Sequence, residues 1–181
     1  LKNRPDLDPT NIYAFGRSLG GAVALDLARY AQQAGLPLRG VIVENTFTSI
    51  SDMVDQVLPI LTPIKRFVLR IGWRSDVIVE QHLQNTNVLY LAGNRDELVP
   101  HSHMQQLYQH SMQTHYKHGT DRPPSWHVIE GGTHNESWIK GGAAYWKAMG
   151  DFMGTTTAPK VDTSTLDDLK ANVIPTMGNN L

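Results

Sequence analysis

The most informative stretch of the sequence is NIYAFGRSLGGAVALDLARYAQQ, residues 11–33. Its first five residues are a short run with β-branched and aromatic side chains, which predicts a strand. Residues 19–33 are rich in Ala and Leu and predict a helix, and Gly35 and Pro37 predict its end. The pentapeptide GRSLG, residues 16–20, joins the two elements directly. The stretch therefore predicts a strand, a very tight turn and a helix.

The same alternation continues along the first 150 residues. Further strands are predicted at 40–43, 87–92 and 125–129, and further helices at 101–112 and 139–153. Strands separated by helices are typical of a parallel sheet that is covered by helices. The sequence therefore predicts an α/β fold.

Two regions fall outside this alternation. Residues 44–85 form an apolar insertion, which we interpret as either a lid or cap or an ordinary covering of the sheet. Residues 154–181 are rich in Thr, Asp, Asn, Gly and Pro and contain few large apolar side chains. Such a segment buries too little apolar surface to offset the entropy of ordering, so we expect a mostly unstructured tail.

Composition excludes several classes of protein. Of the 181 residues 40% are hydrophobic and 18% charged, with a net charge of -1, which indicates a soluble globular domain without the basic excess of a nucleic-acid-binding protein. The absence of cysteine excludes disulfides, thiolate metal sites and a cysteine nucleophile. No apolar run approaches the roughly 20 residues of a membrane-spanning helix.

The turn at residues 16–20 has the pattern Gly-x-Ser-x-Gly between a strand and a helix, which is the setting of a nucleophile elbow. In such a turn the serine hydroxyl projects above the sheet, and we expect Gly16 and Gly20 to provide the necessary space. Ser18 is then a candidate nucleophile, and the backbone N–H of Leu19 is a candidate oxyanion donor. The alternative is that Ser18 serves only as a helix N-cap.

A serine hydroxyl needs a base to remove its proton, and the base needs an acid to orient it. Asp96 follows the third predicted strand and His134 lies in a Gly-rich loop after the fourth. Ser, Asp and His thus occur in this order, each at the carboxyl end of a strand, where open α/β sheets bind their ligands. Alternatively, Asp96 only forms a turn, with Glu97 as a rival acid, and His134 is an ordinary loop histidine.

Two of the other histidines form a pair, His101 and His103, at the start of a predicted helix. They suggest a metal-dependent hydrolase as a third possibility, but no third ligand follows at a suitable spacing. We therefore predict no metal and no organic cofactor.

Four motifs together resemble the Bem46-like and ABHD13-like α/β hydrolases. They are GRSLGGAVA at 16–24, VENTFTSI at 43–50, AGNRDELVP at 92–100 and GTHNESW at 132–138. The resemblance covers residues 10–153 and implies a serine hydrolase with Ser18 as nucleophile, Asp96 as acid and His134 as base. It also implies membrane association and an acyl ester or thioester substrate, for example a small acyl ester or an S-palmitoylated protein.

A complete domain of this family has further strands before the elbow. We therefore expect residues 1–153 to be a partial α/β-hydrolase domain, beginning near the nucleophile elbow, with the elbow strand at an open edge. The loop that supplies the second oxyanion-hole N–H in this fold is expected to lie outside the chain. Because losing one such donor costs roughly 100- to 1000-fold in rate, the alternative function is a catalytically idle scaffold or an inactive fragment.

The insertion contains one further pattern. Thr62 and Pro63 predict a helix start. Arginines on one face of this helix, at 66, 70 and 74, oppose apolar residues at 64, 67, 68 and 71. This amphipathic stretch indicates either a contact with an anionic membrane surface or a solvated basic face over an ordinary core.

Overall fold

The computed structural model describes residues 6–8, 10–53, 72–119 and 122–156. Its elements in chain order are β1 (Tyr13–Arg17), α1 (Leu19–Gln33), β2 (Gly40–Glu44), α4 (Ser75–Gln81), β3 (Asn87–Gly93), α5 (His101–His118), β4 (Ser125–Ile129) and α6 (Ser137–Thr155). The predicted alternation of strands and helices is confirmed. The strand predicted at 11–15 begins and ends two residues later, so that it includes the first two residues of the elbow.

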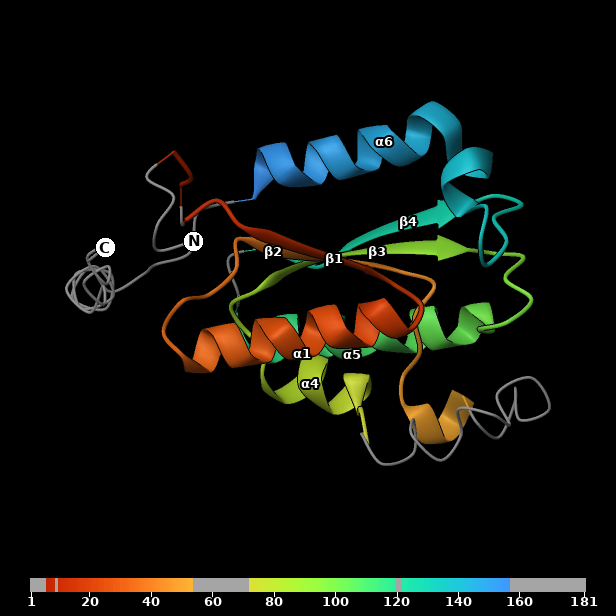
Figure 1. The fold of residues 1–181 in the computed structure, drawn as a ribbon. Coiled ribbons are helices and arrows are strands. Elements are labelled where there is room, and N and C mark those ends of the chain that lie inside the picture. The colour runs from red at the N-terminus through yellow and green to blue at the C-terminus, as the bar shows by residue number, and fades with distance from the viewer. Residues whose placement is uncertain (1–5, 9, 54–71, 120–121, 157–181) are drawn as a thin grey trace, which may run out of the picture.

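The four strands form one parallel sheet in the order β1-β2-β3-β4. In the middle of the sheet Gly16 lies beside Val43, and Val43 lies beside Tyr90. Because all strands run in the same direction, their carboxyl ends meet at one edge, on the right of Figure 1. The loops that follow the strands are therefore neighbours at that edge.

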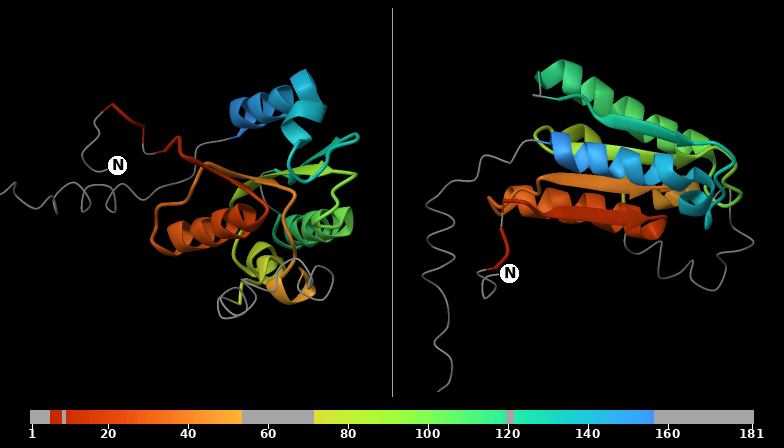
Figure 2. Two further views of the ribbon diagram at one scale, coloured as in Figure 1. Left: turned by 45° about the vertical axis from the view of Figure 1, so that its right-hand side comes forward. Right: turned by 90° about the horizontal axis from the view of Figure 1, so that it is seen from above.

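Helices cover both faces of the sheet (Figure 1 and Figure 2). Helices α1, α4 and α5 lie on one face, where their apolar side chains join those of β1, β2 and β3 in the largest core cluster. Of the described helices only α6 lies on the other face, where Tyr145 and Phe152 pack against Ile42, Leu89 and Leu91. This arrangement explains why β2 is buried along its whole length, as parallel strands usually are.

Among the described strands, β1 pairs only with β2 and forms one edge of the sheet. Its side chains are less buried than those of β2, and Phe15 is 51% exposed. The elbow strand is therefore an edge strand in the described part of the chain.

The described end of the chain differs from the predicted tail. Helix α6 continues to Thr155, with a break in its helical geometry at Gly142, instead of ending at residue 153. Thr156 is then 4% exposed, because its carbonyl accepts hydrogen bonds from the guanidinium of Arg39 and its hydroxyl contacts that of Tyr13. Thr156, the described residue after the helix, thus has specific partners, which composition does not reveal. The remainder of the predicted tail lies outside the described residues.

The region 44–85 is described in two parts. In the second part, α4 packs against α1 and α5, and Ile78, Val79 and Leu83 belong to the largest core cluster. These three residues therefore cover the sheet in the ordinary way. The interpretation of 44–85 as a lid or cap stays a prediction, because residues 54–71 lie outside the described residues. Of the predicted basic stripe only position 74 is described: Arg74 is exposed and forms an ion pair with Asp76 at 2.8 Å. Thr62, Pro63 and the other stripe positions lie outside the described residues. Among the helices that the structure describes, none is long and apolar enough to cross a membrane.

Candidate active site

Ser18 stands between β1 and α1 in a backbone conformation that is rare for a residue with a side chain. Its φ is 52° and its ψ is -125°, outside the helical and extended regions. The residues at the end of β2 hold this conformation, because Ser18 N–H donates to the Glu44 carbonyl at 2.9 Å and the Thr46 hydroxyl donates to the Ser18 carbonyl at 2.7 Å. The Ser18 hydroxyl makes no capping hydrogen bond to α1, so the N-cap interpretation lacks its defining contact.

The glycines of the elbow have different roles. An added Cβ at Gly16 would lie 2.0 Å from the Gly20 carbonyl oxygen, so this close approach of two backbone segments requires glycine. At Gly20 the structure differs from the expectation, since an added Cβ would have no heavy atom within 4 Å. At Gly21 an added Cβ would lie 2.6 Å from Thr46 Cβ. The space needed around the turn is therefore at Gly16, because the backbone of Gly20 approaches it, and at Gly21, because Thr46 passes directly against the start of α1.

Asp96 and His134 form a buried pair. His134 Nδ1 lies 2.8 Å from Asp96 Oδ2, and the side chains are 6% and 1% exposed. The other carboxylate oxygen of Asp96 accepts the backbone N–H groups of Leu98 and Val99, both at 2.8 Å. Three hydrogen bonds thus fix the carboxylate, and the carboxylate fixes the imidazole ring.

The neighbouring acid, Glu97, contacts a different part of the same histidine. Its Oε2 accepts the backbone N–H of His134 at 3.1 Å. Of the two adjacent carboxylates, only Asp96 therefore contacts the ring. The sequence left these two acids as rivals, and their separation depends on how the turn after β3 meets the loop after β4.

Backbone contacts bring these two loops together. An added Cβ at Gly93 would lie 2.5 Å from the Gly132 carbonyl oxygen, so β3 ends directly against the backbone of the His134 loop. Arg95 N–H then donates to the Gly132 carbonyl at 2.9 Å. The short distance between Asp96 and His134 follows from this close approach.

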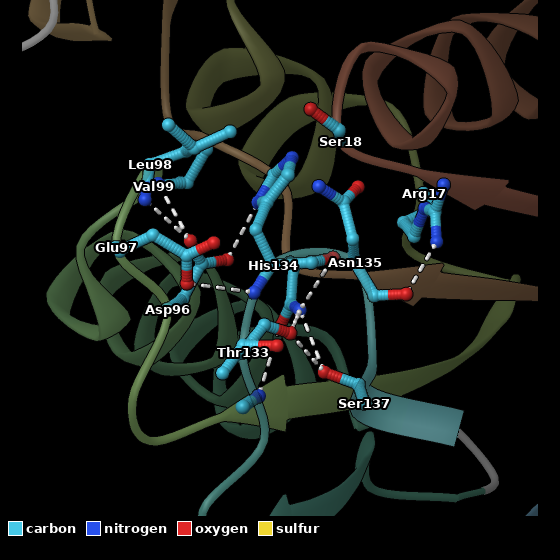
Figure 3. Close-up of polar contacts among 12 residues, drawn as sticks. Arg17, Ser18, Asp96, Glu97, Leu98, Val99, Thr133, His134, Asn135 and Ser137 are labelled. Carbon is cyan, nitrogen blue, oxygen red and sulfur yellow. Dashed lines mark hydrogen bonds and ion pairs between the residues drawn. The ribbon is translucent and has the colours of Figure 1, made fainter. Parts of the chain in front are cut away.

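The candidate nucleophile lies at the same edge. In the view of Figure 3, His134 lies between Asp96 and Ser18. Arg17, which precedes the serine, donates to the Asn135 carbonyl at 3.3 Å and so links the elbow to the histidine loop. No hydrogen bond joins the described side chains of Ser18 and His134.

Leu19 is the first residue of α1. Its backbone N–H belongs to the first turn of the helix, where the N–H groups have no acceptor within the helix. This N–H follows directly after the candidate nucleophile, as an oxyanion donor in such an elbow must.

Sequence reasoning missed two buried residues at this edge, Glu44 and Asn45, both 1% exposed. Glu44 Oε2 accepts the hydroxyl of Tyr145 at 2.7 Å, and Oε1 has no partner among the described residues. Burial raises the pKa of Glu44, while the hydrogen bond from Tyr145 and the charge of Arg17 act in the opposite direction. Glu44 and Asn45 stand directly at the end of a buried strand in the sequence, and this position was the signal that could have identified them.

The histidine pair of α5 does not converge on one point. His101 Nδ1 lies 3.1 Å from the Gly93 carbonyl, whereas His103 is buried and its Nδ1 lies 2.9 Å from Thr48 Oγ1. Within the described ranges, no three His, Asp or Glu side chains are grouped so that they could hold a metal ion.

The parallel sheet, the helices on both faces and the strained serine after β1 define the class: the chain has an α/β-hydrolase fold. Among solved structures, the Pyrococcus furiosus esterase Pf2001 superposes with a TM-score of 0.61 at 14% identity, over 84% of this chain and 55% of that one. An α/β hydrolase from Vibrio vulnificus superposes with a TM-score of 0.54 at 19% identity, over 83% of this chain and 51% of the other.

Homologues of this chain are α/β-hydrolase-domain proteins of the Bem46 family. It is 35% identical to the α/β hydrolase domain-containing protein WAV2 of Arabidopsis thaliana, over 84% of this chain and 50% of WAV2. It is 32% identical to protein bem46 of Schizosaccharomyces pombe, over 84% and 46% of the two chains. It is 35% identical to the membrane protein YNL320W of Saccharomyces cerevisiae, over 77% and 44%. The chain thus spans about half the length of these relatives, and no family model matches it.

Proposed function

We propose that this protein is a serine hydrolase of acyl esters or thioesters, with Ser18 as nucleophile, His134 as base and Asp96 as acid. The observation that carries the proposal is the buried His134–Asp96 pair, with its 2.8 Å contact, at the sheet edge where Ser18 holds its strained conformation. Strained backbone in a residue with a side chain is concentrated at functional sites. The esterase and hydrolase folds of the structural neighbours support the same reaction class.

The reaction proceeds through an acyl-enzyme. Ser18 Oγ attacks the carbonyl carbon of the substrate while His134 Nε2 takes the hydroxyl proton. Asp96 holds the Nδ1–H of the ring, which keeps Nε2 free to accept that proton. His134 then gives the proton to the leaving alcohol or thiol. A water molecule, activated by the same nitrogen, next attacks the acyl carbon, releases the carboxylic acid and restores Ser18.

The oxyanion that forms in each half-reaction needs hydrogen-bond donors. Leu19 N–H is one donor, since it follows the nucleophile at the start of α1. In complete α/β hydrolases a second donor comes from a loop that precedes the elbow. Losing one such donor costs roughly 100- to 1000-fold in rate, so we expect efficient turnover to require both donors.

The proposed substrate carries an apolar acyl group, and S-acylated proteins are the more specific class that we propose. A buried apolar cluster includes one residue of the elbow helix and one of the turn after Asp96; it comprises Ala22, Phe47, Ile50, Met53 and Val99, with Trp73 packed against it. Because Val99 N–H binds Asp96, this cluster lies directly beside the candidate acid. The relative YNL320W is described as a membrane protein, which supports work at a membrane surface where acylated substrates are found.

A fluorophosphonate probe tests the proposal, because it labels a serine only when a base activates the hydroxyl. We expect labelling of the protein to be abolished in Ser18→Ala and retained in Ser125→Ala, a matched control at the opposite end of the sheet. Labelling of a longer form that includes the preceding strands should be faster than that of this chain. Hydrolysis of acyl esters and acyl thioesters of increasing chain length then ranks the substrates.

Folded protein that is not labelled in either form would refute the hydrolase and leave the idle scaffold as the function. Labelling that persists in Ser18→Ala would refute the assignment of the nucleophile. Loss of turnover on adding a chelator would instead favour the metal-dependent alternative.

A further inference from the structure

Asn45 makes contacts that extend across the whole candidate site. It follows β2 directly, is 1% exposed and has a φ of 45°. Asparagine is one of the few residues with a side chain that tolerate this left-handed region. A buried polar side chain in such a conformation is held by its surroundings and has a specific role in them.

The two ends of the Asn45 amide bind different loops. Its Oδ1 accepts the backbone N–H of Gly93 at 2.8 Å, three residues before Asp96. Its Nδ2 donates to Ser137 Oγ at 2.8 Å and to the Thr133 carbonyl at 3.2 Å. Thr133 directly precedes His134, so one planar side chain joins the loop of the acid to the loop of the base.

Ser137 forms a second link between Asn45 and the loop that carries His134. Ser137 Oγ accepts from Asn45 and donates to the Thr133 carbonyl at 2.7 Å. The amide, the hydroxyl and the carbonyl thus close a small ring of hydrogen bonds at the start of α6. This ring fixes the backbone on both sides of His134.

The residues that flank Asn45 bind the third loop. The Glu44 carbonyl accepts Ser18 N–H, and Thr46 Oγ1 donates to the Ser18 carbonyl. Residues 44–46 therefore contact the backbone of the candidate nucleophile and, through the Asn45 side chain, the loops of the other two candidate residues. Glu44 is the last residue of the central strand β2, and Asn45 and Thr46 follow it directly, so this set of contacts starts from a regular element of the fold.

An amide is the side chain that these partners require. Gly93 N–H needs an acceptor, whereas Ser137 Oγ and the Thr133 carbonyl need a donor. A carboxylate of the same shape has no donor. An apolar side chain leaves Gly93 N–H without its acceptor and Ser137 Oγ without its donor, while the contact from Ser137 Oγ to the Thr133 carbonyl remains.

We propose that Asn45 is a positioning residue that sets the distance between the Asp96 turn and the His134 loop. This inference rests on the proposed hydrolase, because the spacing matters for proton transfer by His134. Asn45 itself touches neither substrate nor the reacting atoms. A displacement of about 1 Å in such a site can lower the rate about 100-fold.

The test compares Asn45→Ala with Asn87→Ala. Asn87 lies at the other end of the same sheet, and its Nδ2 donates to the Arg39 carbonyl at 3.1 Å, so the control loses a similar contact far from the site. Hydrolysis of a nitrophenyl ester by the protein should show kcat lowered about 10- to 100-fold in Asn45→Ala, with KM changed less than about threefold. Asn87→Ala should keep both constants within about threefold.

Proton NMR provides a readout that does not depend on turnover. The Nδ1 proton of His134, held by Asp96, should give a strongly downfield resonance in the unmodified protein and in Asn87→Ala. We expect this resonance to disappear or broaden in Asn45→Ala, because the two loops separate. If the unmodified protein shows the resonance but no turnover, the hydrolase is refuted while the NMR comparison still decides the role of Asn45.

A folded Asn45→Ala with unchanged kcat would overturn the inference, as would an unchanged resonance. If Asn45→Ala does not fold, Ser137→Ala removes one acceptor of the same amide and is judged by the same two measurements. A loss of kcat and of the resonance in that variant supports the positioning role, and retention of both overturns it.

Discussion

The packing of the elbow helix against Thr46 predicts opposite effects for two adjacent glycines. An added Cβ at Gly21 would lie 2.6 Å from Thr46 Cβ and 2.7 Å from Thr46 Oγ1. Carbon atoms in contact are normally about 3.5–4 Å apart, so the methyl group and Thr46 must separate by about 1 Å. Thr46 has little freedom to move, because it is fully buried and its hydroxyl holds the Ser18 carbonyl. An added Cβ at Gly20 would meet no heavy atom within 4 Å.

These distances set the expected stabilities. Overpacking of a buried site costs about 1–3 kcal/mol. Replacing glycine by alanine in a helix stabilises it by up to about 1 kcal/mol. Gly20→Ala should therefore raise the free energy of unfolding by up to about 1 kcal/mol. Gly21→Ala receives the same helix contribution, so the difference between the two variants should equal the overpacking cost of about 1–3 kcal/mol.

Urea unfolding followed by tryptophan fluorescence measures both values, with an unchanged m-value as the sign that the same transition is compared. Ester hydrolysis adds a second measurement: Gly21→Ala should lose activity, because a displaced Thr46 no longer holds Ser18, while Gly20→Ala should keep it. Equal midpoints for the two variants would refute the reasoning, since they differ in the structure only in what the new methyl group meets.

Three further predictions concern the ionisable residues. Asp96→Asn should lower kcat by about 10⁴-fold, as loss of the orienting acid does in Ser-His-Asp triads. Glu97→Gln should lower kcat less than about tenfold, because Glu97 binds only the backbone N–H of His134. Burial raises the pKa of Glu44, so the native state binds the carboxyl proton more tightly than the unfolded state and loses stability as pH rises through the raised pKa. At neutral pH Glu44→Gln should therefore be more stable in urea, by about 1.4 kcal/mol for each unit by which the pKa is raised, and this advantage should shrink toward about pH 4. Burial lowers the pKa of His103, so as pH falls through about 6.5 the unfolded state takes up a proton more readily than the native state, and the free energy of unfolding should fall. Between about pH 7.5 and about pH 5.5 the urea midpoint of His103→Gln should therefore fall less than that of the unmodified protein.

Much of the fold could be predicted from local sequence. The strand at 125–129 agrees in full, and the strands at 40–43 and 87–92 each extend by one residue. Helix α5 was predicted at 101–112 but continues to His118 and ends at Gly119, which has a φ of 62°. Its second half is polar and basic, so its apolar periodicity is weak. The helix persists there because Ser111 and Thr114 are buried against the rest of the molecule.

The sequence alone placed Ser18, Asp96 and His134 at one edge of the molecule. Parallel strands bring their carboxyl ends together, so three polar residues that each follow a strand must lie near one another. This inference needs only the order of strands and the position of each residue after its strand. The catalytic roles of the three residues stay predictions that the probe experiment tests.

The tertiary structure decided what local sequence does not encode. The close approach of two loop backbones at Gly93 decides that the imidazole of His134 binds Asp96 and that its backbone N–H binds Glu97. Only the passage of Thr46 against α1 makes Gly21, not Gly20, the glycine that must lack a side chain. Asn45 likewise gains its role from partners about 48 to 92 residues away in the chain. Local propensity depends on neighbours in sequence, whereas these contacts depend on which segments far apart in the chain meet at the sheet edge.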